Sequence, residues 1–239
     1  MQLNNVNNKE RGYSSKNSKD VLVFDVDGTL VDTLPHIYRS YTKAAEKLKL
    51  KHISLEYFRD TYTQAEKFRR HMKILDIPEP LFDDFSFLVS TYFKDEIKIN
   101  KPKIISGVIE MLSILKSENV DLKILSLDDY ENTQYKLGDK ILSFFSEVLS
   151  HDLDKHDVLR NLKDTCSAPI FYVGDCISDG EIAVATQIKF IGLTSKHSFS
   201  SERKMREFIR SNLNNSFEAS TPLRVITAYQ VWRNSDGIF

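Results

Sequence analysis

The stretch VLVFDVDGT, residues 21–29, decides the fold of this chain. Four apolar residues that end abruptly in an aspartate are typical of a strand buried on both faces inside a parallel sheet. The residues after such a strand lie at the carboxyl edge of the sheet, which is where open α/β sheets bind ligands. Asp25 and Asp27 are therefore the first candidates for chemistry.

Similar apolar runs recur at residues 122–127, 170–173 and 190–193, with a weaker one at 147–150. Stretches with helical periodicity lie between most of them. Strands alternating with helices predict an α/β fold with a doubly wound, Rossmann-like parallel sheet. Toward the end of the chain we expect a helix at 201–213 and a final strand at 223–227.

One segment, residues 35–100, breaks this alternation and contains three amphipathic helical patterns in succession, at 37–48, 55–75 and 81–93. The sequence IPEP, residues 77–80, separates the last two patterns, because proline disfavours helix at its own position and just before it. We therefore predict a flexible leader at 1–19, a core formed by 20–34 and 101–239, and a small all-helical cap at 35–100, inserted after the first strand.

Composition excludes several classes of partner. The chain has 239 residues, with 33 Lys and Arg against 34 Asp and Glu, so the net charge of -1 gives no reason to expect a nucleic acid or an anionic membrane. No apolar run approaches the roughly 20 residues that span a bilayer. The leader lacks a secretory signal, and two cysteines are too few for a disulfide framework. We expect a soluble cytoplasmic enzyme, monomer or homodimer, that binds a small molecule.

The first motif has an alternative interpretation as a turn or a calcium loop, since Asp-Gly marks turns and Asp-x-Asp-Gly also begins calcium loops. An EF-hand loop, however, lies between helices and has glutamate at its twelfth position, where this chain has His36. The segment FDVDGTL, residues 24–30, resembles the first motif of the haloacid dehalogenase-like (HAD) hydrolase superfamily. That resemblance implies that Asp25 attacks phosphorus to form an aspartyl-phosphate, and that Asp27 is the general acid and base.

A second acidic motif is YVGDCISDG, residues 172–180, where another apolar run ends in carboxylates. Asp175 and Asp179 are one helical turn apart and can face one point, although an acidic first helical turn would explain Asp179 alone. The segment resembles the fourth motif of the same superfamily. Since Mg²⁺ needs few protein carboxylates and keeps several waters, we predict a magnesium site formed by Asp25, the Asp27 carbonyl, Asp175 and Asp179.

Two weaker candidates would bind phosphate. Ser126 ends an apolar run, and its hydroxyl would hold a phosphoryl oxygen as the second-motif residue does. Lys155 precedes a helix where the third-motif lysine belongs, and its ammonium would offset the repulsion between Asp25 and a phosphate dianion. Both depart from the usual pattern, because LDD follows Ser126 and no Lys-Pro pair follows Lys155. A surface serine and a solvated charge run remain the alternatives.

The resemblance is closest to the type that includes phosphoglycolate phosphatase and β-phosphoglucomutase, with a helical cap. It implies a magnesium-dependent phosphatase acting on a small phosphorylated metabolite. A phosphosugar mutase is one alternative, but it would need an acid and base in the cap that the sequence does not reveal. A binding protein that keeps the fold without turnover is the other. His36, near the start of the cap, is interpreted as a structural or surface histidine.

Overall fold

The computed structural model describes residues 19–62, 68–149 and 154–235, and the leader predicted at 1–19 lies outside them apart from its last residue. Its centre is a six-stranded sheet with the order β5-β4-β1-β6-β7-β8, in which every neighbouring pair runs parallel. The strands are β1 (Val21–Phe24), β4 (Asp121–Leu125), β5 (Glu147–Leu149), β6 (Ile170–Gly174), β7 (Lys189–Leu193) and β8 (Ser216–Ala219). The predicted α/β fold class is confirmed.

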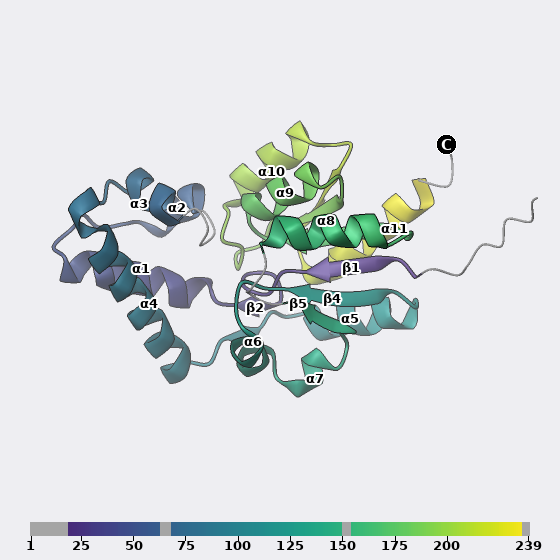
Figure 1. The fold of residues 1–239 in the computed structure, drawn as a ribbon, viewed down its shortest axis with the longest axis horizontal. Helices are drawn as coiled ribbons and strands as arrows, with labels where there is room; N and C mark the ends of the chain where they lie inside the picture. The colour runs from purple at the N-terminus through teal and green to yellow at the C-terminus, as the bar shows by residue number, and fades with distance from the viewer. Residues whose placement is uncertain (1–18, 63–67, 150–153, 236–239) are drawn as a thin grey trace, which may run out of the picture.

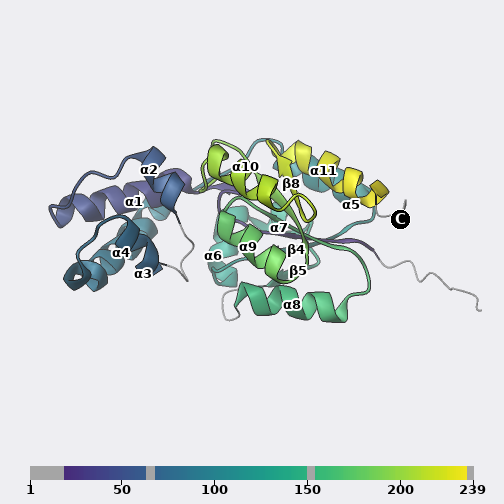
Figure 2. The ribbon, with the colours of Figure 1, turned by 90° about the horizontal axis from the view of Figure 1, so that it is seen from above.

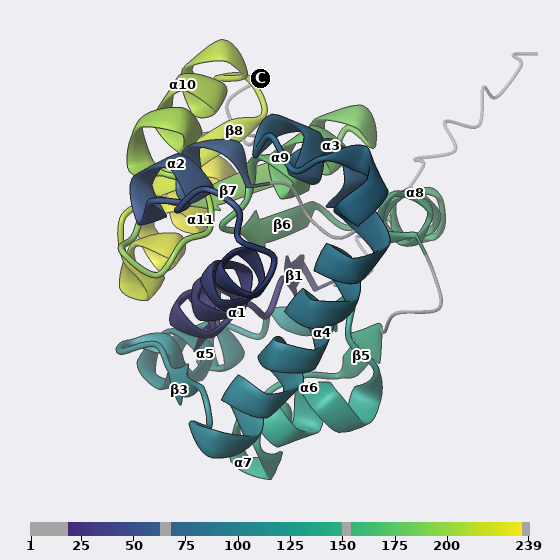
Figure 3. The same ribbon diagram turned by 90° about the vertical axis from the view of Figure 1, so that its left-hand side faces the viewer.

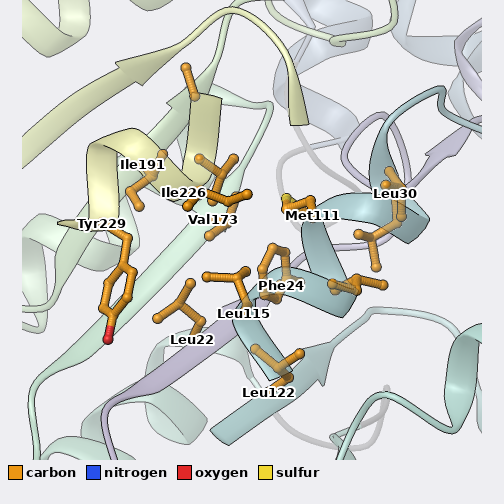
Figure 4. Packing of buried hydrophobic residues seen from close by; sticks show 14 of the residues in the cluster. Leu22, Phe24, Leu30, Met111, Leu115, Leu122, Val173, Ile191, Ile226 and Tyr229 are labelled. Atoms are coloured by element: carbon orange, nitrogen blue, oxygen red, sulfur yellow. The ribbon is translucent and has the colours of Figure 1, made fainter. Parts of the chain in front are cut away.

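Helices cover both faces of this sheet, because successive side chains of each strand point to opposite faces. Leu22 and Phe24 pack in one apolar cluster with α5 (Val108–Ser117), α6 (Tyr130–Leu137), α7 (Asp139–Leu142) and α11 (Pro222–Ser235), part of which is seen in Figure 4. Val21 and Val23 pack in another with α8 (Lys155–Thr165), α9 (Ile177–Ala185) and α10 (Glu202–Ser211). Figure 2 shows α5 and α11 across the sheet from α8.

The final strand predicted at 223–227 is wrong, since these residues belong to α11 and the last strand is β8. The run LRVIT contains β-branched residues that favour strands, but the buried side chains Val225, Ile226, Tyr229 and Trp232 recur with helical spacing. Helix α11 begins at Pro222, where proline is well tolerated because the first helical N–H has no partner within the helix. The helix predicted at 201–213 is present as α10.

The cap lies between β2 (Val31–Asp32) and β3 (Lys103–Ile104), two short strands that pair antiparallel. Its described residues form α1 (Leu34–Lys47), α2 (Leu55–Thr61), α3 (Phe68–Ile74), the 3-10 helix η2 (Glu79–Leu81) and α4 (Phe82–Ile99). In Figure 1 the arrowhead of β1 points toward the cap, and Figure 3 shows the cap helices in front of the strands.

The second helical pattern predicted in the cap is divided in the structure. Helix α2 ends at Thr61, and Tyr62 has extended backbone angles, with φ -58° and ψ 131°. The side chains of α1, α2, α3 and α4 nevertheless form one apolar core. Apolar residues of the predicted second helix therefore pack together, although they belong to two helices.

Among the residues described, no helix combines the length and the apolar character needed to cross a bilayer.

Candidate active site

A cavity of about 380 Å³ lies between the carboxyl edge of the sheet and the cap. Its floor comes from residues that follow three neighbouring strands: Asp25 after β1, Ser126 after β4 and Asp175 after β6. Because the three strands are parallel and adjacent, their ends meet at one edge, and the topology alone brings these side chains together.

Three carboxylates form the centre of this site. Asp25, Asp175 and Asp179 each offer an oxygen, and these oxygens all lie within 4.8 Å of one another. The three residues are at most 7% exposed. Asp179 reaches the cluster from the first turn of α9, one helical turn beyond Asp175, as its spacing predicted.

Two glycines leave the space that this crowding requires. Gly28 has a positive φ of 78°, and a Cβ there would stand 2.2 Å from Oδ2 of Asp175. A Cβ on Gly174 would stand 2.7 Å from Oδ2 of Asp179. A side chain at either position would push a carboxylate out of place, so both motifs need glycine for geometric reasons.

Lys155, the first residue of α8, is the cation of this cluster. Its Nζ donates to Oδ1 of Asp25 at 2.7 Å, to the hydroxyl of Tyr172 at 2.9 Å and to Oδ1 of Asp179 at 3.1 Å. Burial alone would lower the pKa of Lys155, but the attraction of Asp179 and Asp25 outweighs it and raises that pKa well above its usual range. Lys155 is therefore an ammonium that touches the predicted nucleophile.

One ammonium does not balance three buried carboxylates. Burial, reinforced by the charge of Asp179, raises the pKa of Asp25 to about 7 even against the attraction of Lys155. Burial and the charges of Asp25 and Asp179 also raise the pKa of Asp175 well above its usual range. A divalent cation would relieve this repulsion, and clustered carboxylate oxygens are the donors that Mg²⁺ prefers. The residues present thus fit a magnesium ion.

The side chain of Asp27 faces a different partner. Both of its carboxylate oxygens accept hydrogen bonds from Nζ of Lys136, each at 2.7 Å, and the same Nζ lies 2.5 Å from Oδ2 of Asp128. Lys136 is only 2% exposed and comes from α6. It offsets the charge of Asp128, which would otherwise repel a phosphate in the cavity.

Sequence reasoning missed Lys136, since a single lysine ten residues after Ser126 belongs to no motif. The only signal available was the unusual acidic pair after Ser126. Two adjacent carboxylates favour a cation nearby, but they do not identify which residue supplies it.

Ser126 is buried and lines the cavity, and its hydroxyl accepts the N–H of Asp128 at 3.1 Å. His36 is buried as well, with Nε2 2.6 Å from the carbonyl oxygen of Asn100, so it joins the two ends of the cap and does not line the cavity. Of the two interpretations of His36, this buried position supports the structural one and not the surface one.

Cys176 lines the cavity but is a poor nucleophile. Burial, together with the charges of Asp179 and Asp175, raises the pKa of its thiol to about 12, so the reactive thiolate is scarce near neutral pH.

The loop after β7 connects the cap to the carboxylate cluster. Arg59 of α2 donates to the carbonyl oxygens of Ser195 and Ser200, at 2.9 and 3.3 Å. From the same loop, the N–H of Phe199 donates to Oδ2 of Asp175 at 2.5 Å. The ring centroids of Phe199 and Tyr62 are 4.7 Å apart. Sequence reasoning had not included this loop, because its serines and phenylalanine follow no recognised pattern.

Comparison with known proteins agrees with this geometry. A family model described as haloacid dehalogenase-like hydrolase matches residues 22–193. No curated protein matches the chain.

Solved structures with the same fold share little sequence with the chain. A predicted phosphoglycolate phosphatase from Haemophilus somnus is 17% identical with a TM-score of 0.64. A haloacid dehalogenase-like hydrolase from Streptococcus pneumoniae is 19% identical with a TM-score of 0.65, and a candidate β-phosphoglucomutase from Thermotoga maritima is 20% identical with a TM-score of 0.58. Each match covers 88% of this chain and 98% of the other.

Proposed function

Because the chain belongs to the haloacid dehalogenase-like hydrolase family, we propose that it is a magnesium-dependent phosphatase that cleaves a small phosphomonoester through an aspartyl-phosphate on Asp25. The observation that carries this proposal is the buried cluster of Asp25, Asp175 and Asp179, in which Asp25 and Asp179 accept hydrogen bonds from the ammonium of Lys155. Such a cluster costs free energy to bury and is retained where it serves chemistry.

Asp25, Asp175 and the backbone carbonyl of Asp27 would hold the magnesium ion, with Asp179 beside them. When bound, Mg²⁺ supplies positive charge to the phosphoryl oxygens and to the carboxylates around it. The chain's own contribution is to keep these oxygens together and away from bulk water, so that no reorganisation is needed when phosphate enters.

In the first step a carboxylate oxygen of Asp25 attacks phosphorus, the bond from phosphorus to the ester oxygen breaks, and Asp27 gives a proton to the departing alcohol. In the second step Asp27 takes a proton from water, the water oxygen attacks phosphorus, and Asp25 is released with inorganic phosphate. Lys155 and Ser126 hold phosphoryl oxygens in both steps, and Lys136 orients Asp27.

The cap does not favour the mutase alternative. A mutase must move protons on a bound sugar, yet no described cap residue that lines the cavity carries a carboxylate or an imidazole. The intact cluster likewise speaks for turnover over a purely binding role. Cytoplasmic location and a monomeric or homodimeric state stay predictions.

The test is release of inorganic phosphate from p-nitrophenyl phosphate and a panel of small phosphate esters, with and without Mg²⁺. We expect Mg²⁺-dependent turnover that falls on the order of 10⁴-fold or more in Asp25→Asn. Asp83→Asn, which alters an exposed carboxylate in the cap, should behave like wild type. Absence of turnover on every ester, or full activity in Asp25→Asn, would refute the proposal.

A further inference from the structure

The cavity has a charged floor and an uncharged wall. All of its charged lining residues come from the core: Asp25, Asp27, Asp128, Lys155 and Asp175. The described cap residues that line it are Ile37, Tyr41, Tyr62, Phe68, Ser86, Val89, Ser90 and Phe93. None of these cap residues carries a charged group, and four of the eight are aromatic. The part of the substrate that meets the cap therefore meets aromatic rings, aliphatic side chains and uncharged hydroxyl groups.

The two tyrosines of this wall remain neutral. Burial raises the pKa of Tyr41 and of Tyr62 well above the usual range of a phenol. Arg59 of α2 is a cation close in sequence to Tyr62. It donates to the carbonyl oxygens of Ser195 and Ser200 and does not line the cavity. Among the described residues, the cap thus presents no positive charge to the organic part of a substrate.

Two serines on α4 are the aliphatic hydroxyl groups of the wall. Ser86 and Ser90 are one helical turn apart and both line the cavity. Every other serine or threonine within the described cap helices hydrogen-bonds a backbone carbonyl of its own helix: Ser40, Thr42, Thr61 and Thr91. The hydroxyls of Ser86 and Ser90 make no such bond in the part of the chain that is described, so they are available to a ligand.

The wall of the cavity selects against a second anionic group. A single phosphate would be met by Lys155, but a carboxylate or another phosphate on the same substrate would find no cation among the described cap residues that line the cavity. Unpaired burial of such a charge is costly. A cavity of about 380 Å³ holds one ring and a phosphate, at the small end of ordinary ligand sites.

Resting on the phosphatase function proposed above, we propose that the substrate is the phosphate monoester of an uncharged alcohol that carries an aromatic or heteroaromatic ring, with a hydroxyl or carbonyl group that reaches Ser86 and Ser90. The ring of the substrate packs against the cap aromatics, and the two serines hydrogen-bond its polar substituent. We expect an anionic ester such as phosphoglycolate to be a poor substrate, because no described cap residue that lines the cavity is a cation.

The test compares kcat/KM of the full chain with Mg²⁺ for four esters of primary alcohols, whose leaving groups are chemically alike. They are benzyl phosphate, 3-(hydroxymethyl)benzyl phosphate, glycerol 1-phosphate and phosphoglycolate. We expect both ring esters to exceed the other two by about tenfold or more, as burial of a ring predicts. A higher kcat/KM for phosphoglycolate or glycerol 1-phosphate than for the ring esters would overturn the proposal.

The role of the serines has its own readout. Ser86→Ala should lower kcat/KM for 3-(hydroxymethyl)benzyl phosphate about fivefold, the value of one ordinary hydrogen bond. Thr91→Ala, which removes a hydroxyl bonded to its own helix, should leave that value unchanged. An equal kcat/KM for Ser86→Ala and Thr91→Ala would show that the serines do not bind the polar substituent.

Failure of the substrate class is distinguishable from failure of the phosphatase function. If Asp25-dependent hydrolysis occurs but favours phosphoglycolate, the function stands and the substrate class falls. If no ester is hydrolysed, the phosphatase falls, and calorimetry with Mg²⁺ then compares benzylphosphonate with phosphonoacetate. Tighter binding of benzylphosphonate, by about tenfold or more, supports an aromatic ligand, and any other result overturns it.

Discussion

The carboxyl edge of the sheet and the interior of the cap are both buried, yet they are held together in opposite ways. At the edge, the carboxylates of Asp25, Asp175 and Asp179 are clustered and two of them pair with Lys155, so stability there depends on balancing charge. The cap interior is a cluster of rings and aliphatic side chains in which His71 is a buried titratable group. On the proposed function, the edge carries out the reaction on phosphate and the cap sets the shape of the cavity, so we expect the two regions to respond to different perturbations.

The largest effect should come from Lys155→Met. Removing the cation leaves buried carboxylates without a partner, which costs about 3–5 kcal/mol of unfolding free energy. Added Mg²⁺ should return part of that loss, because the ion would compensate the same carboxylates. Urea denaturation with and without Mg²⁺ measures both effects. Lys163→Met, an exposed change on the same helix, serves as the control. A loss that Mg²⁺ does not reduce would contradict charge balance as the principle of the edge.

The cap should instead lose stability in acid through His71. Burial lowers the pKa of His71 from 6.5 to about 4, so the folded state favours the neutral ring. As pH falls from 6.5 toward 4, the unfolded chain binds a proton that the folded chain does not, and about 3 kcal/mol of stability is lost.

Denaturation of wild type and His71→Phe between pH 7 and pH 4 tests this expectation. The difference in unfolding free energy between wild type and His71→Phe should shift in favour of the variant by about 3 kcal/mol as pH falls from 7 to 4. His52→Phe changes an exposed histidine and should follow wild type. Parallel pH profiles for wild type and His71→Phe would show that the ring titrates normally in the fold.

Lys136 joins the two regions, because its Nζ contacts Asp27 and also lies 5.6 Å from the ring centroid of Phe93 in the cap. On the proposed mechanism, Lys136→Met should lower kcat about 10- to 100-fold by releasing Asp27 from its position. Steady-state kinetics with Mg²⁺ measures this, beside Lys140→Met as an exposed control. An unchanged kcat would mean that Asp27 is oriented without Lys136.

The smallest effect concerns an ion cluster that links α1 and α4 within the cap. Glu96 of α4 is 7% exposed in its side chain and pairs with Lys43 and Arg39 of α1, at 2.5 and 2.8 Å. Both cations are nearly half exposed, so Glu96→Gln should cost only about 1 kcal/mol at pH 7.

The pairing with Lys43, and then with Arg39, lowers the pKa of Glu96 below its ordinary 4.5. The stability that Glu96 adds is therefore present above pH 4.5 and lost as pH falls through the folded-state pKa. Urea denaturation at pH 7 and pH 3 should show the difference from wild type only at pH 7, with Glu56→Gln as an exposed control. A difference that persists at pH 3 would assign the effect to packing.

Features that depend on residues adjacent in the chain could be predicted from the sequence, whereas features that depend on distant residues could not. The apolar run at 21–24 and the acidic residues after it are adjacent in the chain, so both the strand and the position of Asp25 could be inferred. Spacing also placed Asp179 one turn from Asp175. Residues 223–227 were misassigned because five residues do not distinguish a strand from the start of a helix whose apolar spacing continues to Trp232.

The remaining features depend on contacts between distant parts of the chain. Lys136 meets Asp27 across 109 residues, and the N–H of Phe199 meets Asp175 across 24. Neither residue belongs to a repeating pattern or a motif. The positions of Ser86 and Ser90 in the sequence do not indicate a role, and only the packed cap shows that they line the cavity. Sequence reasoning thus reached the proposed chemistry but not the substrate.

The most direct test of the central claim is to trap the phosphoenzyme. The full chain would be mixed with Mg²⁺ and the ester that it hydrolyses fastest, quenched in acid within milliseconds, reduced with borohydride and analysed by peptide mass spectrometry. An acyl phosphate on Asp25 would be reduced to homoserine, so we predict homoserine at position 25 only when substrate and Mg²⁺ are both present. Steady release of phosphate with an unmodified Asp25, or with the modification at another residue, would contradict the account.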